Sequence, residues 1–208
     1  MDNSPAMVSL VYDERMLLHS HTSTSNHPER PARVSETINL VKSSEIFSNP
    51  NLVIRDQARE ATLEEISTVH RESYVDFISN MWPEGCDREA INIGSSYFNQ
   101  HTPLAAKLST GAGMMALEDL YNGFKYSFAL IRPPGHHVCG ENSNIWGFCV
   151  FNNVAIAAKK AIKDFNCKKV LIFDWDAHHG DGTQNVFYES SEVLYVSLHK
   201  LNDLLRQV

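Results

Sequence analysis

The segment at residues 170–182, VLIFDWDAHHGDG, constrains the fold of this chain more than any other stretch. It starts with aliphatic and β-branched residues, and three acids and two histidines follow within eight positions. This pattern predicts a buried strand with a polar site at its carboxyl end, where open parallel α/β sheets bind ligands. Because alternate residues of an extended segment point to one side, Asp174, Asp176 and His178 can face one point. Carboxylates and imidazoles together suit zinc or a similar divalent ion.

The alternative interpretation of this segment is a strand end whose polar side chains only cap the following helix. Capping a helix needs just one such side chain. Burying three acids and two histidines without a cation would cost a large free energy. The pattern therefore favours a metal site.

The bulk composition limits the classes of protein to which the chain can belong. Its 208 residues predict a single domain, and 43% apolar with 21% charged residues is ordinary for a globular protein. The net charge, 18 − 25 = −7, argues against direct binding to nucleic acid. The four cysteines, Cys86 among them, have no CxxC spacing, which favours a reducing compartment. Neither a signal peptide nor a membrane span is expected.

The rest of the chain alternates between strand and helix patterns. A capping-box pattern at Thr62 and Glu65 predicts the start of one helix, and residues 82–101 are expected to form a long surface loop. Such alternation predicts a parallel sheet with helices on both faces. The predicted strands are residues 7–12, 51–55, 126–131, 169–173 and 193–198. One predicted helix begins at residue 32, and four more are predicted at residues 62–70, 73–80, 104–121 and 154–166.

A second motif, RPPGHH at residues 132–137, directly follows a predicted strand. Its prolines and glycine fix an unusual turn before His136 and His137. Paired imidazoles at a strand end suit acid–base catalysis because histidine titrates near neutral pH. The alternative is two solvent-exposed loop histidines. If both motifs lie on one rim of the sheet, Asp174 and Asp181 can orient and polarise the imidazoles.

Two further segments allow two interpretations each. Gly147 and Phe148 can wall a narrow apolar slot, or Phe148 can be an ordinary core residue. Ser197 and Leu198 end the last predicted strand, where a hydroxyl and backbone carbonyls can help to bind a monovalent cation. A plain strand terminus explains them equally well.

Together these residues resemble the zinc-dependent histone deacetylase family. The matching pieces are HPERPARV, LSTGAG, RPPGHH, GFCVFNNVAIAA, VLIFDWDAHHGDGTQ and VLYVSLH. The resemblance implies the arginase/deacetylase fold, a three-layer α/β/α architecture with a mainly parallel central sheet, over residues 7–200. Residues 1–6 would be an extension and residues 201–208 an atypical tail. RPPGHH, GFCVFNNVAIAA and DWD are similar to class II enzymes, whereas Asp181 is more similar to class I.

The resemblance also implies ion ligands. Asp176 and His178 would bind zinc. The region of Asp174, Asp176, His178, Ser197 and Leu198 would hold a potassium ion.

The same resemblance implies roles in proton transfer. His136 and His137 would form the catalytic pair, of which one activates the zinc-bound water and the other protonates the leaving lysine amine. Asp174 would pair with His136, and Asp181 with His137.

Substrate contacts follow from the resemblance as well. Phe148, with Gly147, would line the acyl-lysine tunnel, Ser95 would contact the substrate backbone, and Arg33 would lie at the channel for acetate exit. The implied partners are acetylated histones or other acetyl-lysine proteins and corepressor proteins, with no direct nucleic acid or membrane, in the nucleus or cytoplasm.

The family's third zinc ligand, an Asp, and its transition-state-stabilising Tyr lie downstream of the matched positions. We therefore expect a truncated form with the N-terminal two-thirds of a deacetylase domain. The alternatives to a lysine deacetylase are an inactive deacetylase-like module that acts through binding, and a polyamine deacetylase.

Overall fold

The computed structural model describes residues 6–21, 27–82, 91–141 and 145–200, so Cys86 and the predicted tail lie outside the described residues. Two short 3-10 helices are η1 Glu14–Leu18 and η2 Glu45–Ser48. The strands are β1 Val8–Val11, β2 Leu52–Arg55, β3 Ile91–Ile93, β4 Ser96–Phe98, β5 Tyr126–Ala129, β6 Val170–Asp174 and β7 Val193–Ser197. The α-helices are α1 Ala32–Ser43, α2 Leu63–Ser67, α3 Glu72–Asn80, α4 Thr102–Tyr121, α5 Asn153–Lys163 and α6 Asp181–Phe187.

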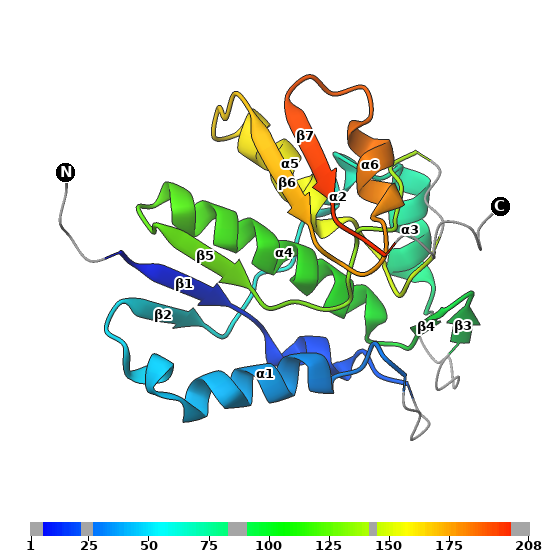
Figure 1. Ribbon diagram of the computed structural model, residues 1–208. Coiled ribbons are helices and arrows are strands. Elements are labelled where there is room, and N and C mark those ends of the chain that lie inside the picture. The colour runs from blue at the N-terminus through cyan, green and yellow to red at the C-terminus, as the bar shows by residue number, and fades with distance from the viewer. Residues whose placement is uncertain (1–5, 22–26, 83–90, 142–144, 201–208) are drawn as a thin grey trace.

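Two parallel sheets lie side by side (Figure 1). One has the strand order β2-β1-β5, and the other pairs β6 with β7. In the first sheet, Val8 of β1 aligns with Leu52 of β2 and with Tyr126 of β5. The arrows of β5 and β6 point the same way in Figure 1. The carboxyl ends of the strands that precede the two sequence motifs therefore lie on the same rim.

The first sheet is covered by a helix on each face. Leu10 of β1 belongs to a buried cluster with Ile38 of α1. Its neighbour Val11 points the other way, into a cluster with Leu108 and Ala112 of α4. This alternation is the period of two that a strand buried on both faces requires.

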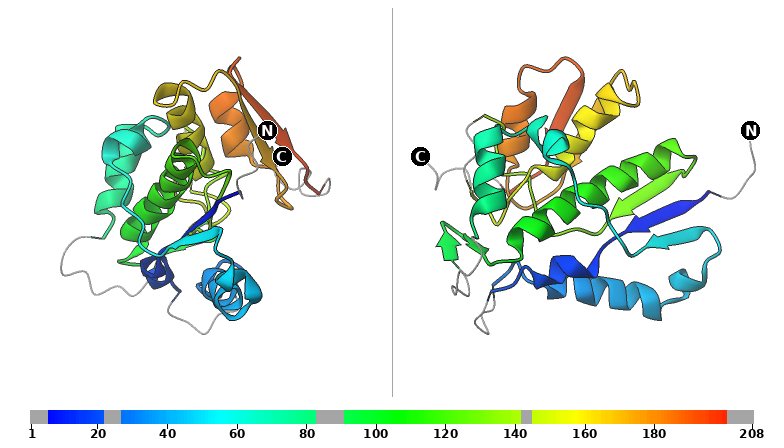
Figure 2. Two further views of the ribbon diagram at one scale, coloured as in Figure 1. Left: turned by 90° about the vertical axis from the view of Figure 1, so that its left-hand side faces the viewer. Right: turned by 180° about the vertical axis from the view of Figure 1, so that it is seen from behind.

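The second sheet buries only one face among the described residues. Ile172 of β6 and Val193 of β7 pack in the largest core cluster with residues of α5 and α6. Leu171 and Leu194, on the opposite face, are each 63% exposed. In the left-hand view of Figure 2, β6 and β7 lie at the right-hand edge of the molecule, with α5 and α6 on their inner side. Among the described residues, helices thus cover only one face of this sheet.

Several local predictions are confirmed. The capping box at the start of α2 is present: the Glu65 amide donates to Thr62 Oγ1 at 3.1 Å, and the Thr62 amide donates to Glu65 Oε2 at 2.9 Å. The helix predicted at residues 104–121 forms as α4 and starts two residues earlier. None of the described helices combines the length and apolarity that crossing a membrane requires.

Two local predictions need correction. The stretch at residues 82–101 is not simply a loop, because β3 and β4 form an antiparallel hairpin within its described part. The three-residue strands are too short, and their Ser, Asn and Gly neighbours too turn-like, for a sequence pattern to show them. Helix α6 was not among the predicted helices; only its first two residues, Asp181 and Gly182, belong to the segment at residues 170–182.

Candidate active site

The two motifs meet at the rim where β5 and β6 end. The rings of His136 and His137 lie 4.2 Å apart between centroids, and the ring of His178 lies 6.1 Å from that of His137. These side chains face a cavity of about 500 Å³. Its lining residues are Pro28, Glu29, Arg33, Ser95, Pro134, His136, His137, Trp146, Gly147, Phe148, Asp176, Ala177 and His178.

Each histidine of the RPPGHH turn is hydrogen-bonded to a carboxylate from the other motif. His136 Nδ1 lies 2.9 Å from Asp174 Oδ2, and His137 Nδ1 lies 2.7 Å from Asp181 Oδ1. The imidazoles are 16% and 7% exposed; Asp174 is equally buried, at 14%, whereas the Asp181 side chain is 50% exposed. These are the two pairings that the resemblance implies, and the catalytic roles of the four residues stay predictions.

Asp174 is the centre of this hydrogen-bond network. Besides His136, its carboxylate accepts from the Tyr195 hydroxyl at 2.9 Å and from the Asp176 amide at 3.1 Å. Burial raises the pKa of Asp174, but these hydrogen bonds outweigh it and bring the pKa to about 2. Burial lowers the pKa of His136, and the hydrogen bond and charge of Asp174 more than reverse this, so the net shift is upward. The pair is therefore built to carry opposite charges.

Asp181 and Tyr195 complete the electrostatics around the imidazoles. Burial raises the pKa of Asp181, and its hydrogen bond with His137 outweighs that effect, so the pKa is lowered. Burial, assisted by Asp174, raises the pKa of Tyr195, which stays a neutral donor. Tyr195 was missed by the sequence reasoning, although it precedes Ser197 by two positions and so shares its side of β7.

Gly180 makes the close packing of this network possible. A Cβ atom at this position would collide with the Asp174 carboxylate, the Tyr195 hydroxyl and the ring of His136. The glycine therefore lets the chain pass directly over the carboxylate that orients His136.

The RPPGHH turn is fixed by its backbone carbonyl groups. The carbonyl of Pro133 accepts from Ser109 Oγ of α4 at 2.9 Å, and that of Pro134 accepts from the Val150 amide at 3.1 Å. The carbonyl of His136 accepts from the Thr183 amide of α6 at 3.0 Å. Because these partners come from separate elements, the positions of both histidines depend on the whole core.

Arg132 anchors the start of the turn in the interior. Its side chain is fully buried and donates to both carboxylate oxygens of Glu29, at 2.9 and 2.7 Å. It also donates to the Tyr97 hydroxyl and to the Met16 carbonyl, each at 2.7 Å. A bidentate pair with its remaining donors satisfied is the arrangement in which a buried charge is tolerated. The motif alone did not reveal this role, since the partners are distant in the sequence.

Arg33 lines the same cavity at its Glu29 side. Its guanidinium lies 3.4 Å from Glu29 Oε1 and is half exposed. The structure therefore brings Arg33 to the cavity wall, next to the buried Arg132 cluster. Its assignment to an acetate channel is untested.

Ser95, Gly147 and Phe148 form one wall of the cavity. Ser95 Oγ accepts from the Gly147 amide at 3.2 Å, which ties the β3–β4 hairpin to this wall. Both Gly147 and Phe148 have left-handed backbones, with φ of 58° and 68°. Such a φ is costly for a bulky side chain and needs support from its surroundings. The ring of His27 supplies one contact, edge to face with Phe148 at 4.8 Å.

Asp176 and His178 lie beside the histidine pair and are much more accessible, with side chains 50% and 57% exposed. Asp176 Oδ1 and His178 Nδ1 are 3.2 Å apart. Two ligands on a tetrahedral zinc ion, each at about 2.0–2.1 Å, are separated by about 3.3 Å. The two donor atoms thus fit neighbouring zinc positions in type and spacing. Among the described residues, no group of three or more His, Cys, Asp or Glu side chains forms a complete metal site.

The residues expected near a potassium ion also come together. Asp174 and Ser197 are paired across β6 and β7, and the Leu198 amide donates to the Asp174 carbonyl at 2.8 Å. Ser197 Oγ lies 2.8 Å from His199 Nδ1. The region is therefore assembled, whereas its occupation by a cation stays a prediction.

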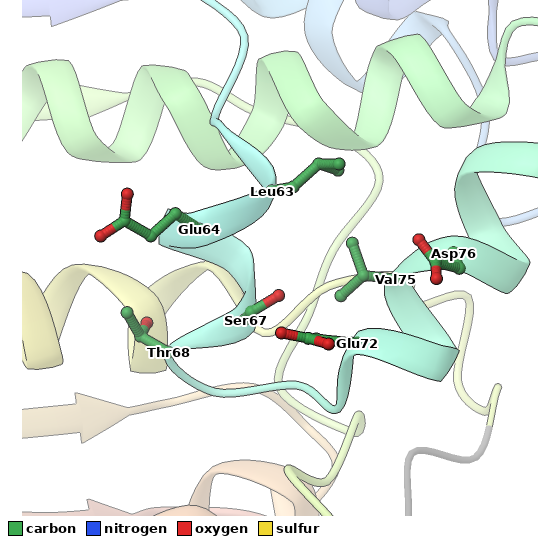
Figure 3. Close-up of a pocket in the computed structure, with 7 residues that line it drawn as sticks. All are labelled: Leu63, Glu64, Ser67, Thr68, Glu72, Val75 and Asp76. Carbon is green, nitrogen blue, oxygen red and sulfur yellow. The ribbon is translucent and has the colours of Figure 1, made fainter.

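A second cavity of about 500 Å³ lies between α2 and α3 (Figure 3). Its lining carries carboxylates and hydroxyls but no imidazole, so its chemistry does not match that of the first cavity. The lining residues are Leu63, Glu64, Ser67, Thr68, Glu72, Val75 and Asp76. Of these two cavities of similar volume, only the first brings together groups that can move protons and bind zinc.

Comparison with known proteins supports the same assignment of fold and family. Histone deacetylase HDA1 of Saccharomyces cerevisiae is 36% identical over 218 residues, covering 95% of this chain and 31% of that protein. Histone deacetylase clr3 of Schizosaccharomyces pombe is 39% identical, covering 92% of this chain and 29% of that protein. A crystal structure of the HDA15 HD domain matches with a TM-score of 0.83 and 36% identity, covering 93% of this chain and 53% of that one. The chain thus spans less than a third of these two curated relatives.

The fold and the site define an α/β protein of the arginase/deacetylase type. The histone deacetylase domain family matches residues 27–204. The chain belongs to this family, and its relatives are of the class II type that the wording of its motifs indicates.

Proposed function

We propose that this chain carries the proton-transfer groups and two zinc ligands of a lysine deacetylase, which hydrolyses the acetamide of acetyl-lysine in histones or other proteins. The observation that supports this most strongly is the pair of imidazoles, each bonded to its own carboxylate, beside Asp176 and His178. Membership of the histone deacetylase domain family supports the same substrate class.

Asp176 and His178 would hold the zinc ion. When bound there, zinc supplies a Lewis acid that polarises the amide carbonyl and lowers the pKa of a water molecule. The other steps depend on side chains of the chain itself.

The histidine pair would move the protons of the reaction. Because Asp174 and Asp181 engage both Nδ1 atoms, the Nε2 atoms are left for proton exchange. His137 would accept the proton of the attacking water. His136, whose pKa Asp174 raises, would hold the proton that the lysine nitrogen receives as the C–N bond breaks. The products are acetate and the free lysine amine.

The cavity wall would hold the substrate. Phe148 and Gly147 would enclose the aliphatic part of the acetyl-lysine side chain, and Ser95 would contact the substrate backbone. Arg33 would lie on the path of the departing acetate, and the region of Asp174, Ser197 and Leu198 would bind potassium.

Zinc content and turnover test this proposal together. Asp176→Ala and His178→Ala should each abolish zinc binding, measured by elemental analysis, and hydrolysis of an acetyl-lysine peptide. Asp76→Ala removes a carboxylate from the second cavity and should leave both intact. Turnover at the wild-type rate in either site variant would refute the assignment.

A second candidate function is binding without catalysis. It is favoured by the half-exposed Asp176 and His178 and by the lack of a complete three-ligand site among the described residues. A sensitive assay on the purified 208-residue chain with excess zinc separates the two. Zinc-dependent release of acetate would reject the binding module.

The proposed partners are acetylated histones or other acetyl-lysine proteins and corepressor proteins. The chain would bind them in the nucleus or the cytoplasm. Co-purification from nuclear and cytoplasmic extracts, followed by identification of bound proteins, tests this part.

A further inference from the structure

An exposed tryptophan stands at the cavity that holds the catalytic histidine pair. Trp146 lines this cavity, and 42% of its surface remains accessible. Sequence reasoning singled out Gly147 and Phe148 in the same segment but not Trp146. A large, rigid aromatic side chain exposed beside a binding cavity is a typical anchor for a binding partner.

The backbone around Trp146 is held in place on two sides. Its carbonyl accepts from the Cys149 amide at 3.0 Å, which closes a tight turn. The next residue, Gly147, donates to Ser95 Oγ in the connection between β3 and β4. Trp146 is therefore presented by a fixed segment, so little conformational entropy is lost when a ligand contacts it.

The turn of the β3–β4 hairpin lies near the indole without crowding it. Even a Cβ atom added at Gly94 would come no closer than 4.0 Å to Trp146 Cε3. His27 Nε2 lies 3.2 Å from the Ser95 carbonyl and its ring contacts Phe148. Two segments distant in sequence thus supply the aromatic residues His27, Trp146 and Phe148, which we call the aromatic rim.

The charges around the rim favour a cationic ligand. The chain has a net charge of −7. Arg33 is the exposed cation of the lining, and it lies 3.4 Å from Glu29. A tryptophan face in such surroundings attracts a guanidinium or ammonium group more strongly than any other side chain of its kind.

We propose that Trp146 binds the cationic side chain of a lysine or arginine next to the acetyl-lysine of the substrate and so determines sequence preference. This inference rests on the proposed deacetylase function. Phe148 contacts the acetyl-lysine side chain inside the cavity, and Trp146 contacts the adjacent residue at its mouth.

Binding of labelled peptides to the zinc-loaded chain tests the inference. Fluorescence anisotropy would compare acetyl-lysine peptides that carry arginine, lysine, norleucine or glutamate at the flanking position. The peptides with arginine and lysine should bind about two- to fivefold more tightly than the norleucine peptide, the usual range of an exposed cation–π contact. The glutamate peptide should bind least tightly.

Variants of Trp146 locate the effect. Trp146→Ala should abolish the difference between the arginine and norleucine peptides, and Trp146→Phe should keep part of it. Phe47→Ala removes an aromatic side chain that is 51% exposed on η2 and should leave the difference unchanged. A difference that persists in Trp146→Ala would overturn the inference.

The design separates this inference from the proposed function. Wild-type chain that binds acetyl-lysine peptides, but binds the arginine and norleucine peptides equally, overturns only the role of Trp146. Wild-type chain that does not distinguish an acetyl-lysine peptide from one with norleucine in place of acetyl-lysine overturns the proposed function and this inference with it.

Discussion

The two halves of the site differ in how the protein supports them. His136 and His137 are 16% and 7% exposed, and each is bonded to a carboxylate from another segment. Asp176 and His178 are 50% and 57% exposed, and Asp176 is bonded to His178 and to Asp174 within the same short segment. The histidine half, to which we assign proton transfer, is thus held mainly by the core, although the Asp181 side chain is itself 50% exposed.

This difference suggests what fixes each half. Side chains that are themselves buried and hydrogen-bonded keep their geometry without a ligand, which is what acid–base catalysis needs. Exposed ligands from one segment gain their fixed positions from the metal, whose binding free energy also stabilises the fold. The predictions below test whether the halves are independent, from the largest expected effect to the smallest.

Removing an imidazole should damage chemistry without removing the metal. His137→Ala should lower kcat by about 100- to 10,000-fold, the usual contribution of a general acid or base. Zinc content should stay at the wild-type level, because Asp176 and His178 are unchanged. Parallel kinetics and elemental analysis check this, and simultaneous loss of zinc would show that the halves are not independent.

Breaking the buried ion pair between Arg132 and Glu29 should destabilise the part of the core that holds the histidine turn. Arg132→Met leaves the Glu29 carboxylate buried without its partner and should lower the free energy of unfolding by about 3–5 kcal/mol. The double variant Arg132→Met with Glu29→Gln should recover part of this loss. Guanidinium unfolding monitored by circular dichroism measures both. An unfolding free energy unchanged by Arg132→Met would contradict the proposed support of the turn.

Zinc should stabilise the folded protein through its contacts with Asp176 and His178. At a free concentration about 100 times its Kd, a ligand that binds only the folded state adds about 2.7 kcal/mol. Zinc should therefore raise the Tm of the wild type and of His137→Ala, and a chelator should reverse this. His178→Ala should show little change. A zinc effect that survives His178→Ala would place the ion elsewhere.

The pair of Asp174 and His136 should make a smaller, pH-dependent contribution to the free energy of unfolding. The pKa of Asp174 falls from its ordinary 3.8 to about 2 in the folded protein. Its stabilisation is therefore present above pH 3.8 and is lost as the pH falls towards 2, by at most about 2 kcal/mol. Unfolding measured across this range should show a shallower pH dependence for Asp174→Asn than for the wild type. Equal pH profiles would show that the pairing with His136 contributes no stability.

The meeting of the two motifs could be predicted because parallel strands bring their carboxyl ends to one rim. The strands at 126–131 and 169–173 needed only correct type and direction for His136 and Asp174 to approach. The partners of Arg132 could not be predicted, since Glu29 and Tyr97 reach it through long-range packing that no periodicity records. The sequence pattern of β6 and β7 does not show which face is covered, because an apolar residue such as Leu171 indicates a buried strand whether or not its cover is present.

The division of the strands into two parallel sheets has a mechanical consequence. Because β5 and β6 belong to different sheets, no strand pairing joins the two sheets in the described residues, and α4 and α5 pack against each other between them. At that seam Thr110 Oγ1 donates to Asn153 Oδ1 at 2.7 Å, and Asn153 Nδ2 donates to Ser109 Oγ at 3.0 Å. These hydrogen bonds among three buried polar side chains therefore help to hold the two sheets in a fixed relative position. The histidine turn follows a strand of one sheet and the acidic segment follows a strand of the other, so the alignment of the two motifs depends on this contact.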